Sequence, residues 1–331
     1  MTGKLTTVVG AGSWGTALAI HAARCGHSVR LWVRNQDSLQ GLLQTRINET
    51  YLPGVRLPES IEISSDPSCL DGADYTVWAI PSLYFRDTFE RLLPGLRDGA
   101  VLISAIKGME SETSLRISEI VRKLSGNRFI FSVLSGPSFA KEVVQEHPTA
   151  VVIGTANERI GKQIQNDFRS PYFRLYYNDD VVGIEIGGCV KNIIAIAAGV
   201  VTGLGYGYNT TAGLITRGLA ELSRLAVHLG AKPSTLAGLA GLGDLILTCT
   251  GHLSRNRQVG VELGKGKTIQ QITGQMKMIA EGVCTTEAIY RLSTKLGVSM
   301  PITEQVYKLI YENREPRAAI LELMSRELSK E

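Results

Sequence analysis

Two lysines of this 331-residue chain stand where a proton could be exchanged with a bound carbonyl group. Lys107 comes three residues after the β-branched run Val101–Ser104, and ligands of open α/β sheets bind beyond the carboxyl ends of strands. Lys191 lies in an apolar stretch with helical spacing, where an ammonium must reach solvent, pair with an acid or face a wet cleft. Lysine can donate a proton when a carbonyl oxygen becomes an alkoxide. Helix physics alone leaves a solvent-directed Lys191 and a functional Lys191 equally open.

A second group of polar residues has the composition of a phosphate site. Gly241–Asp244 and Thr248 precede Ser254, Arg255 and Asn256, which stand at an expected helix start. A hydroxyl, a guanidinium, an amide and unpaired backbone N–H groups together suit a phosphate dianion. Asp244 could position a lysine ammonium or accept a hydrogen bond from a ligand hydroxyl. The alternative is that Ser254 only caps the helix.

The N-terminus carries the spacing G-x-G-x-x-G as Gly10, Gly12 and Gly15, directly after a strand pattern and at the start of a helix pattern. Gly10 permits the tight turn, Gly12 lets backbone approach a pyrophosphate, and Gly15 allows close packing of helix on strand. This context favours a dinucleotide site over a glycine-rich turn without a ligand.

Arg34 stands at the end of the second expected strand, where an NAD-specific site usually has Asp or Glu for the ribose 2′-hydroxyl. A guanidinium can instead pair with a 2′-phosphate through two hydrogen bonds. The sequence therefore predicts NADP(H) as cofactor, with NAD(H) left open as a second one. A solvated surface arginine is the alternative.

The hydrophobic patterns predict an α/β protein, with an N-terminal doubly wound Rossmann-type domain over residues 1–178 and a C-terminal all-helical domain over residues 179–331. The expected strands are Leu5–Val9, Val29–Val33, Ile61–Ser64, Tyr75–Ile80, Val101–Ser104, Phe129–Leu134, Ala150–Ile153 and Phe173–Tyr177. The expected helices of the first domain are Ser13–Arg24, Asp37–Thr45, Leu83–Leu93, Glu112–Lys123, Phe139–Gln145 and Glu158–Arg169. Those of the second are Asp180–Val201, Thr210–Leu229, Pro233–Leu236, Leu242–Thr248, Asn256–Leu263, Thr268–Met276, Gly282–Leu296, Ile302–Glu312 and Pro316–Ser325.

Composition narrows the function. The net charge of +4 is spread without basic blocks, which argues against a nucleic-acid binder and suits a small anionic substrate. The five cysteines form no C-x-x-C pair, so no metal site is predicted. Gly266-Lys267-Thr268 resembles the end of a P-loop, but the glycine that a P-loop needs at position 261 is missing, which argues against a nucleotide triphosphatase. The apolar run Ile193–Val201 is far short of the roughly 20 residues of a membrane span. We expect a cytoplasmic protein without a membrane span.

These motifs together resemble the bacterial-type NAD(P)-dependent glycerol-3-phosphate dehydrogenases over most of the chain. The matching segments are Gly10–Ala19, Tyr51–Pro53, Lys107–Gly108, Leu134–Ala140, Gly187–Gly188, Lys191–Asn192, Gly241–Asp244, Leu247–Thr250, Ser254–Arg257 and Glu281–Gly282. The resemblance implies reversible reduction of dihydroxyacetone phosphate to sn-glycerol 3-phosphate, which supplies glycerophospholipid synthesis.

The resemblance also implies residue roles. Lys191 would be the proton donor and acceptor at the substrate C2 oxygen. The substrate would be bound by Lys107, Gly136, Ser138, Lys191, Asp244, Ser254, Arg255 and Asn256. The cofactor would be bound by Gly10, Gly12, Ser13, Trp14, Gly15, Arg34, Lys107, Ala140, Arg255, Ile279 and Glu281.

Three positions depart from the family pattern: Cys189 replaces a usual alanine, and Tyr208 and Thr211 replace a commoner acidic and basic pair. These three departures leave undetermined how the loops pack over the site.

Two alternative functions remain. A related two-domain reductase of a ketopantoate or hydroxy-acid type would not need the Ser254–Asn256 cluster, and a non-catalytic dinucleotide-sensing module would not need Lys107, Lys191 and Asp244. A homodimer is expected only as the commonest symmetric oligomer.

Overall fold

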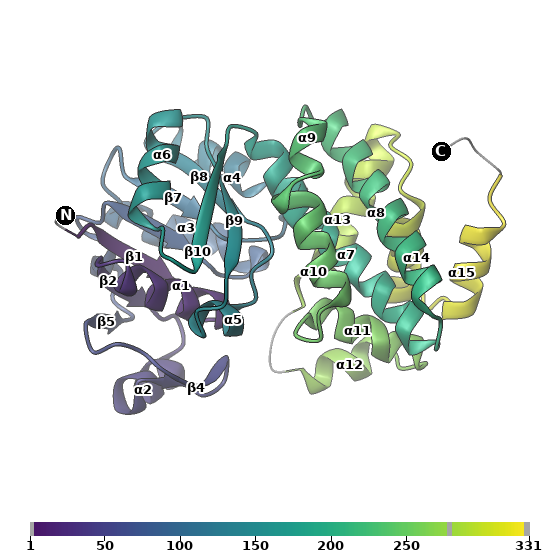
Figure 1. Ribbon diagram of the computed structural model, residues 1–331, viewed down its shortest axis with the longest axis horizontal. Helices are drawn as coiled ribbons and strands as arrows, with labels where there is room; N and C mark the ends of the chain where they lie inside the picture. Colours follow the sequence, from purple (N-terminus) through teal and green to yellow (C-terminus); the bar gives the residue numbers. More distant parts are fainter. Residues whose placement is uncertain (1–2, 277–279, 328–331) are drawn as a thin grey trace.

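The computed structural model describes residues 3–276 and 280–327 and shows an α/β half beside a helical half (Figure 1). The strands of the main sheet are β1 (Leu5–Val9), β2 (Ser28–Trp32), β5 (Ile61–Ser64), β6 (Tyr75–Trp78), β7 (Val101–Ser104), β8 (Ile130–Ser135), β9 (Thr149–Gly154) and β10 (Phe173–Asn178). They lie in the order β10-β9-β8-β7-β6-β1-β2-β5. From β5 to β8 this is the strand order of a doubly wound dinucleotide-binding fold.

The register aligns the carboxyl ends of the central strands. Val9 pairs with both Trp32 and Trp78, and Trp78 pairs with Ser104. The residues that follow these strands therefore meet along one edge of the sheet. This edge collects the glycine loop, Arg34 and the segment that carries Lys107.

Two features of the strands were not predicted from the sequence. β9 pairs antiparallel to β8, with Leu134 opposite Ile153, so the sheet is mixed at this end. A small antiparallel hairpin, β3 (Ile47–Asn48) with β4 (Leu52–Arg56), follows the helix α2 (Gln36–Thr45). β4 contains Pro53 and Gly54, which weaken a strand pattern, so tertiary hydrogen bonds rather than periodicity determine this hairpin.

Helices cover both faces of the sheet. They are α1 (Ser13–Arg24), α2 (Gln36–Thr45), α3 (Phe85–Leu92), α4 (Ile117–Ser125), α5 (Ala140–Val144) and α6 (Glu158–Asp167), with the short turns η1 (Pro67–Leu70), η2 (Ser82–Tyr84) and η3 (Leu93–Gly95). α4 begins five residues later than expected, because the Glu119 carboxylate accepts a hydrogen bond from the Arg116 backbone N–H at 2.8 Å, which stabilises the helix start there.

Only helices follow Asn178 in the described part of the chain. They are α7 (Val181–Gly203), α8 (Tyr208–His228), α9 (Pro233–Leu236), α10 (Asp244–Thr250), α11 (Arg255–Gly264), α12 (Ile269–Gln275), α13 (Glu281–Leu296), α14 (Pro301–Tyr311) and α15 (Pro316–Met324). The turn η4 (Leu239–Gly243) is π-helical and leads into α10.

α7 is the central helix of this half. By length and composition it could cross a membrane, but most of its residues are buried in the protein's own core. Gly199 and Gly203 face Gly260 and Gly264 of α11, and a Cβ on Gly199 would lie 2.1 Å from the carbonyl oxygen of Arg257. The four glycines thus let the two backbones touch, which packs α11 closely on α7, the helix that carries Lys191.

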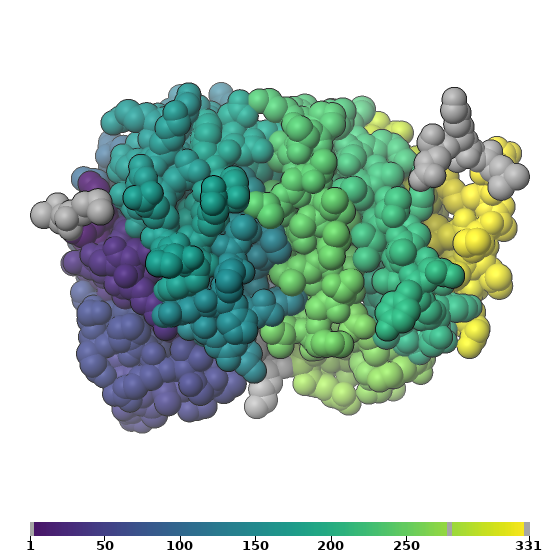
Figure 2. Space-filling model, viewed as in Figure 1, coloured from purple at the N-terminus to yellow at the C-terminus, as the bar shows by residue number. Residues whose placement is uncertain are grey.

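The two halves pack side by side (Figure 2) and are joined by a buried ionic cluster. Glu185 of α7 accepts hydrogen bonds from the Arg116 guanidinium at 2.7 Å and from the Ser118 backbone N–H at 2.8 Å. Burial raises the pKa of Glu185 despite these partners. The cluster ties α7, which carries Lys191, to α4 of the α/β half.

Candidate active site

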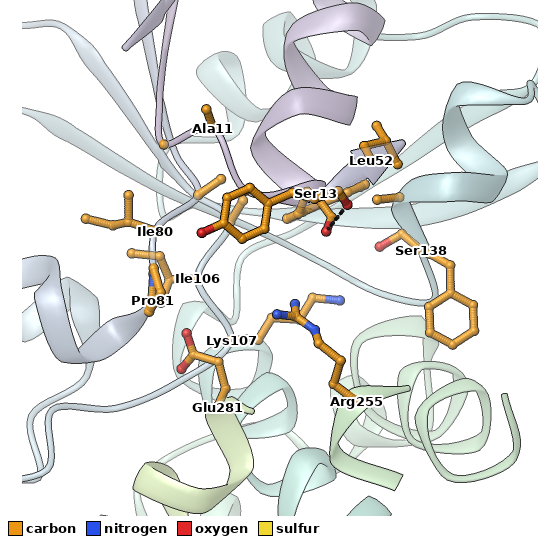
Figure 3. A pocket seen from close by; sticks show the side chains of 18 of the residues that line it. Ala11, Ser13, Leu52, Ile80, Pro81, Ile106, Lys107, Ser138, Arg255 and Glu281 are labelled. Carbon is orange, nitrogen blue, oxygen red and sulfur yellow. Dashed lines mark hydrogen bonds between the residues drawn. The ribbon is translucent and has the colours of Figure 1, made fainter. Parts of the chain in front are cut away.

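A cavity of about 750 Å³ opens between the two halves at the carboxyl edge of the sheet. Figure 3 shows Ala11 and Ser13 on one wall, facing Arg255 and Glu281 of the helical half, with Lys107 between them. Most of the residues singled out from the sequence line it: Gly10, Gly12, Ser13, Trp14, Arg34, Lys107, Ser138, Ala140, Lys191, Asp244, Ser254, Arg255, Asn256 and Glu281.

The glycine loop fits a dinucleotide. Gly10 has φ +109°, and a Cβ there would lie 2.8 Å from the Ala79 carbonyl oxygen. Gly15 packs against the same loop, because its Cβ would lie 1.9 Å from the Gly10 carbonyl oxygen. Gly12 differs: its φ of −73° suits any residue, and a Cβ would meet no described atom within 4 Å. Neither backbone conformation nor packing within the described chain requires glycine at position 12, and the missing side chain leaves room for a ligand to approach the start of α1.

The β3–β4 hairpin, which was not predicted from the sequence, supports the glycine loop. The Asn48 side-chain amide donates hydrogen bonds to the Ala11 carbonyl and the Thr16 hydroxyl, both at 2.8 Å. The Ser13 hydroxyl donates to the Tyr51 carbonyl at 2.7 Å. The hairpin thereby brings Tyr51, Leu52 and Pro53 to the cavity wall.

The two lysines meet at one carboxylate. Lys107 Nζ lies 2.7 Å from Asp244 Oδ2 and 2.9 Å from the Gly136 carbonyl oxygen. Lys191 Nζ donates to Asp244 Oδ1 and, at 3.0 Å, to the Thr248 hydroxyl. The Thr248 hydroxyl itself donates to the Asp244 carbonyl at 2.6 Å, so its lone pairs remain for the ammonium. Lys191 is 5% exposed; it is therefore paired in a buried site rather than directed to bulk solvent.

This arrangement sets two ionisation states. Burial lowers the pKa of Lys191 to about 7, although Asp244 raises it and Lys107 lowers it further. Burial raises the pKa of Asp244, but the two ammonium groups outweigh it and hold the pKa below its usual value. The site thus combines a permanent carboxylate with an amine that can hold or release a proton near neutral pH.

The start of α11 faces the same space. Ser254 is the N-cap of α11, because its hydroxyl accepts a hydrogen bond from the Arg257 backbone N–H at 3.3 Å. The capping role offered as an alternative is therefore present, and Ser254 also lines the cavity. Asn256 is more constrained than the sequence indicated. Its side-chain amide donates to Asn192 at 2.9 Å and its oxygen accepts from the Gly282 backbone N–H at 2.9 Å. Since Asn192 donates to the Lys107 carbonyl at 2.9 Å, a chain of amide hydrogen bonds joins α13, α11 and α7 to the Lys107 segment.

Glu281 closes the cavity from the start of α13. Its carboxylate accepts from the Ser82 backbone N–H at 3.0 Å and from the Ser82 hydroxyl at 2.7 Å. Burial raises the pKa of Glu281, although the two hydrogen bonds from Ser82 lower it. Ser82 comes from η2 of the α/β half and had no sequence signal, because only the tertiary fold brings it to Glu281.

The remaining sequence candidates fall elsewhere. Gly15 and Gly136 are not among the lining residues; Gly15 serves packing, and Gly136 supplies the carbonyl that binds Lys107. Ile279 lies outside the described residues. Tyr208 is 94% exposed at the start of α8, Cys189 is buried in α7, and neither these two nor Thr211 lines the cavity.

A Rossmann sheet with a ligand-ready glycine loop, facing a buried lysine across a cleft, defines a two-domain nicotinamide-dinucleotide-dependent oxidoreductase. Comparison with known families agrees. The chain belongs to the family of NAD-dependent glycerol-3-phosphate dehydrogenases: the N-terminal family model matches residues 6–161 and the C-terminal model matches residues 180–321.

Similar proteins match nearly the whole length of the chain. The glycerol-3-phosphate dehydrogenase [NAD(P)+] of Citrifermentans bemidjiense is 49% identical over 98% of both chains. The crystal structure of glycerol-3-phosphate dehydrogenase from Coxiella burnetii is 37% identical, with a TM-score of 0.95 over 98% of this chain and 100% of that one. A ketopantoate reductase from Ralstonia eutropha, 17% identical with a TM-score of 0.63 over 97% of this chain and 99% of that one, shares the fold alone.

Proposed function

We propose that this chain catalyses the reversible reduction of dihydroxyacetone phosphate to sn-glycerol 3-phosphate, with NADP(H) preferred and NAD(H) accepted. The observation that carries the proposal is the buried ion pair of Lys191 with Asp244, placed across the cavity from the glycine loop. When bound, the nicotinamide dinucleotide would supply the hydride for reduction in its reduced form and take up the hydride of the reverse reaction in its oxidised form.

Lys191 is the proton donor in this proposal. Its ammonium has three N–H donors, and two are directed at Asp244 and Thr248, which leaves the third for a ligand oxygen in the cavity. In reduction, the C2 carbonyl carbon gains hydride, its oxygen takes the proton from Lys191, and the neutral amine regains a proton from solvent. In oxidation, neutral Lys191 accepts the hydroxyl proton. A pKa near 7 allows both steps.

Asp244 and Lys107 serve as the fixed charges around this proton. Asp244 holds both ammonium groups, so it keeps Lys191 oriented and stabilises its charged form. Lys107 adds a second positive charge, which favours an oxygen that develops negative charge beside it.

The phosphate of the substrate would bind at the start of α11. Arg255 supplies a guanidinium, Ser254 a hydroxyl and Asn256 its second amide N–H, next to the backbone N–H groups of the first helical turn. The Ser138 hydroxyl donates to the Gly136 carbonyl at 2.9 Å and lines the same cavity. This cluster would favour the proposed substrate over an unphosphorylated keto acid, which has no phosphate to bind there.

The cofactor would lie along the sheet edge, with its pyrophosphate at Gly12 and the start of α1. Ser13, Trp14, Ala140 and Glu281 line this path, and Arg34 would bind the 2′-phosphate. We further propose a division of the chain between residues 178 and 179, a cytoplasmic homodimer, and supply of phospholipid precursors as the cellular role.

The decisive experiment is loss of NADPH or NADH absorbance with dihydroxyacetone phosphate, compared with ketopantoate and pyruvate. Turnover confined to the phosphorylated ketone is the expected result. Preference for an unphosphorylated keto acid would favour the related reductase, and binding without turnover of any ketone would favour a sensing module.

A further inference from the structure

Arg34 is stacked on an aromatic ring from a different part of the chain. Its guanidinium carbon lies 4.3 Å from the centroid of the Tyr84 ring. Arg34 follows β2, whereas Tyr84 ends the turn η2 after β6, and both line the cavity. Arg34 is exposed and Tyr84 is half-buried.

Stacking and phosphate binding use different parts of a guanidinium. The ring contacts its face, while the N–H donors that bind a phosphate lie in its plane and point from its edge. An exposed arginine otherwise loses rotamer entropy when it is fixed. A ring that already holds the plane therefore lowers the cost of binding an anion at the edge.

Tyr84 is well placed to hold that plane. Ser82, two residues earlier, is bonded twice to Glu281, and the Tyr84 backbone N–H donates to the Pro81 carbonyl at 3.0 Å. The next residue, Phe85, is fully buried, with its ring 5.5 Å from that of Trp78. The backbone on both sides of Tyr84 is thus anchored.

The charges of the cavity agree with an anion at this end. Among its described lining residues the acids are Asp244 and Glu281, and they are engaged by the two lysines and by Ser82. No carboxylate in that set stands beside Arg34 to receive a ribose 2′-hydroxyl.

We propose that Tyr84 is a specificity-determining residue: its ring holds the Arg34 guanidinium so that the edge binds the 2′-phosphate, and this sets the preference for NADPH over NADH. The inference rests on the proposed binding of that phosphate by Arg34.

The test measures Kd for NADPH and for NADH by fluorescence titration, without substrate, for Tyr84→Val and Tyr84→Phe. Each variant is made in the native background and with Arg34→Ala. An exposed cation–π contact is worth about 0.5–1 kcal/mol, so Tyr84→Val should raise Kd for NADPH about two- to fivefold and leave Kd for NADH within about twofold. Tyr84→Phe keeps an aromatic ring beside Arg34 and should retain the native Kd for NADPH. In the Arg34→Ala background Tyr84→Val should have no further effect.

Leu83→Ala is the matched control, since Leu83 belongs to the same turn, is 52% exposed and does not line the cavity. Equal loss of both cofactors in Tyr84→Val, or an undiminished loss beside Arg34→Ala, would overturn the inference. The two proposals can fail separately. If Arg34→Ala leaves the ratio of the two Kd values unchanged, the assignment of the 2′-phosphate to Arg34 is wrong. If only Tyr84→Val leaves it unchanged, the role of Tyr84 is wrong.

Discussion

Lys191 of α7 and Asp244 of α10 form a buried ion pair, with 6% and 1% of their side chains exposed. A buried pair of this kind is weak evidence for stability, because the loss of solvation offsets the attraction. Its position at the cavity gives it another use, since burial keeps the ammonium close to losing its proton.

Lys191→Ala should lower kcat about 10²- to 10⁴-fold, the usual contribution of a positioned general acid or base. Lys191 lies across the cavity from the glycine loop, so Kd for NADPH, from fluorescence titration, should remain within about twofold. Lys162→Ala is a control, because Lys162 is exposed and pairs with Glu158 within α6, on the surface of the other half. Equal losses of turnover and cofactor affinity would mean that Lys191 supports the cofactor instead.

The pH profile should follow the charge around Lys191. Oxidation of glycerol 3-phosphate needs the neutral amine, so kcat/KM should rise with pH with a midpoint near the Lys191 pKa of about 7. Lys107→Met removes a charge that lowers this pKa and should move the midpoint to higher pH. Asp244→Asn removes a charge that raises it and should move the midpoint to lower pH. Movement of both midpoints in one direction would exclude Lys191 as the titrating group.

Two glycines of the loop should differ in what they affect. Gly12→Ala places a methyl group in space that no described atom fills, so the thermal midpoint should stay unchanged while Kd for NADPH rises. Overpacking costs about 1–3 kcal/mol, which corresponds to about five- to 150-fold in Kd. Gly15→Ala forces a Cβ against the Gly10 carbonyl and should lower the thermal midpoint. A stable Gly12→Ala variant with native NADPH affinity would contradict the binding of the pyrophosphate at this loop.

Arg34→Asp should weaken NADPH binding far more than NADH binding, because a carboxylate repels the 2′-phosphate and can accept from a 2′-hydroxyl. The ratio of kcat/KM values for the two cofactors, measured at saturating dihydroxyacetone phosphate, reports the change. Asp37→Ala in α2 is a nearby control, since Asp37 is exposed and does not line the cavity. An unchanged ratio in Arg34→Asp would contradict the predicted preference.

Most elements, and the chemical groups that they carry, could be predicted from the sequence alone. Strand and helix periodicity placed nearly every element to within a few residues, because burial of one face dictates the spacing of apolar residues. The glycine spacing, Arg34 and the helix start at Ser254 could be recognised because each belongs to a local pattern: a glycine loop after a strand, a charged residue at the end of the second strand, and an N-cap. Lys107, Lys191 and Asp244 were identified as unusual, but not as one ion-paired group.

Which of these groups lie in contact depends on the tertiary fold and could not be predicted from the sequence. The Lys107–Asp244–Lys191 triad, the Ser82–Glu281 contact, the Asn48 support of the glycine loop and the stacking of Arg34 on Tyr84 join residues from separate elements. The antiparallel β9 and the β3–β4 hairpin likewise depend on pairing partners distant in the chain. Periodicity reports which face of an element is buried, but not what that face is buried against. The protonation of Lys191 depends on that second fact, because both its desolvation and its partner charges come from other elements.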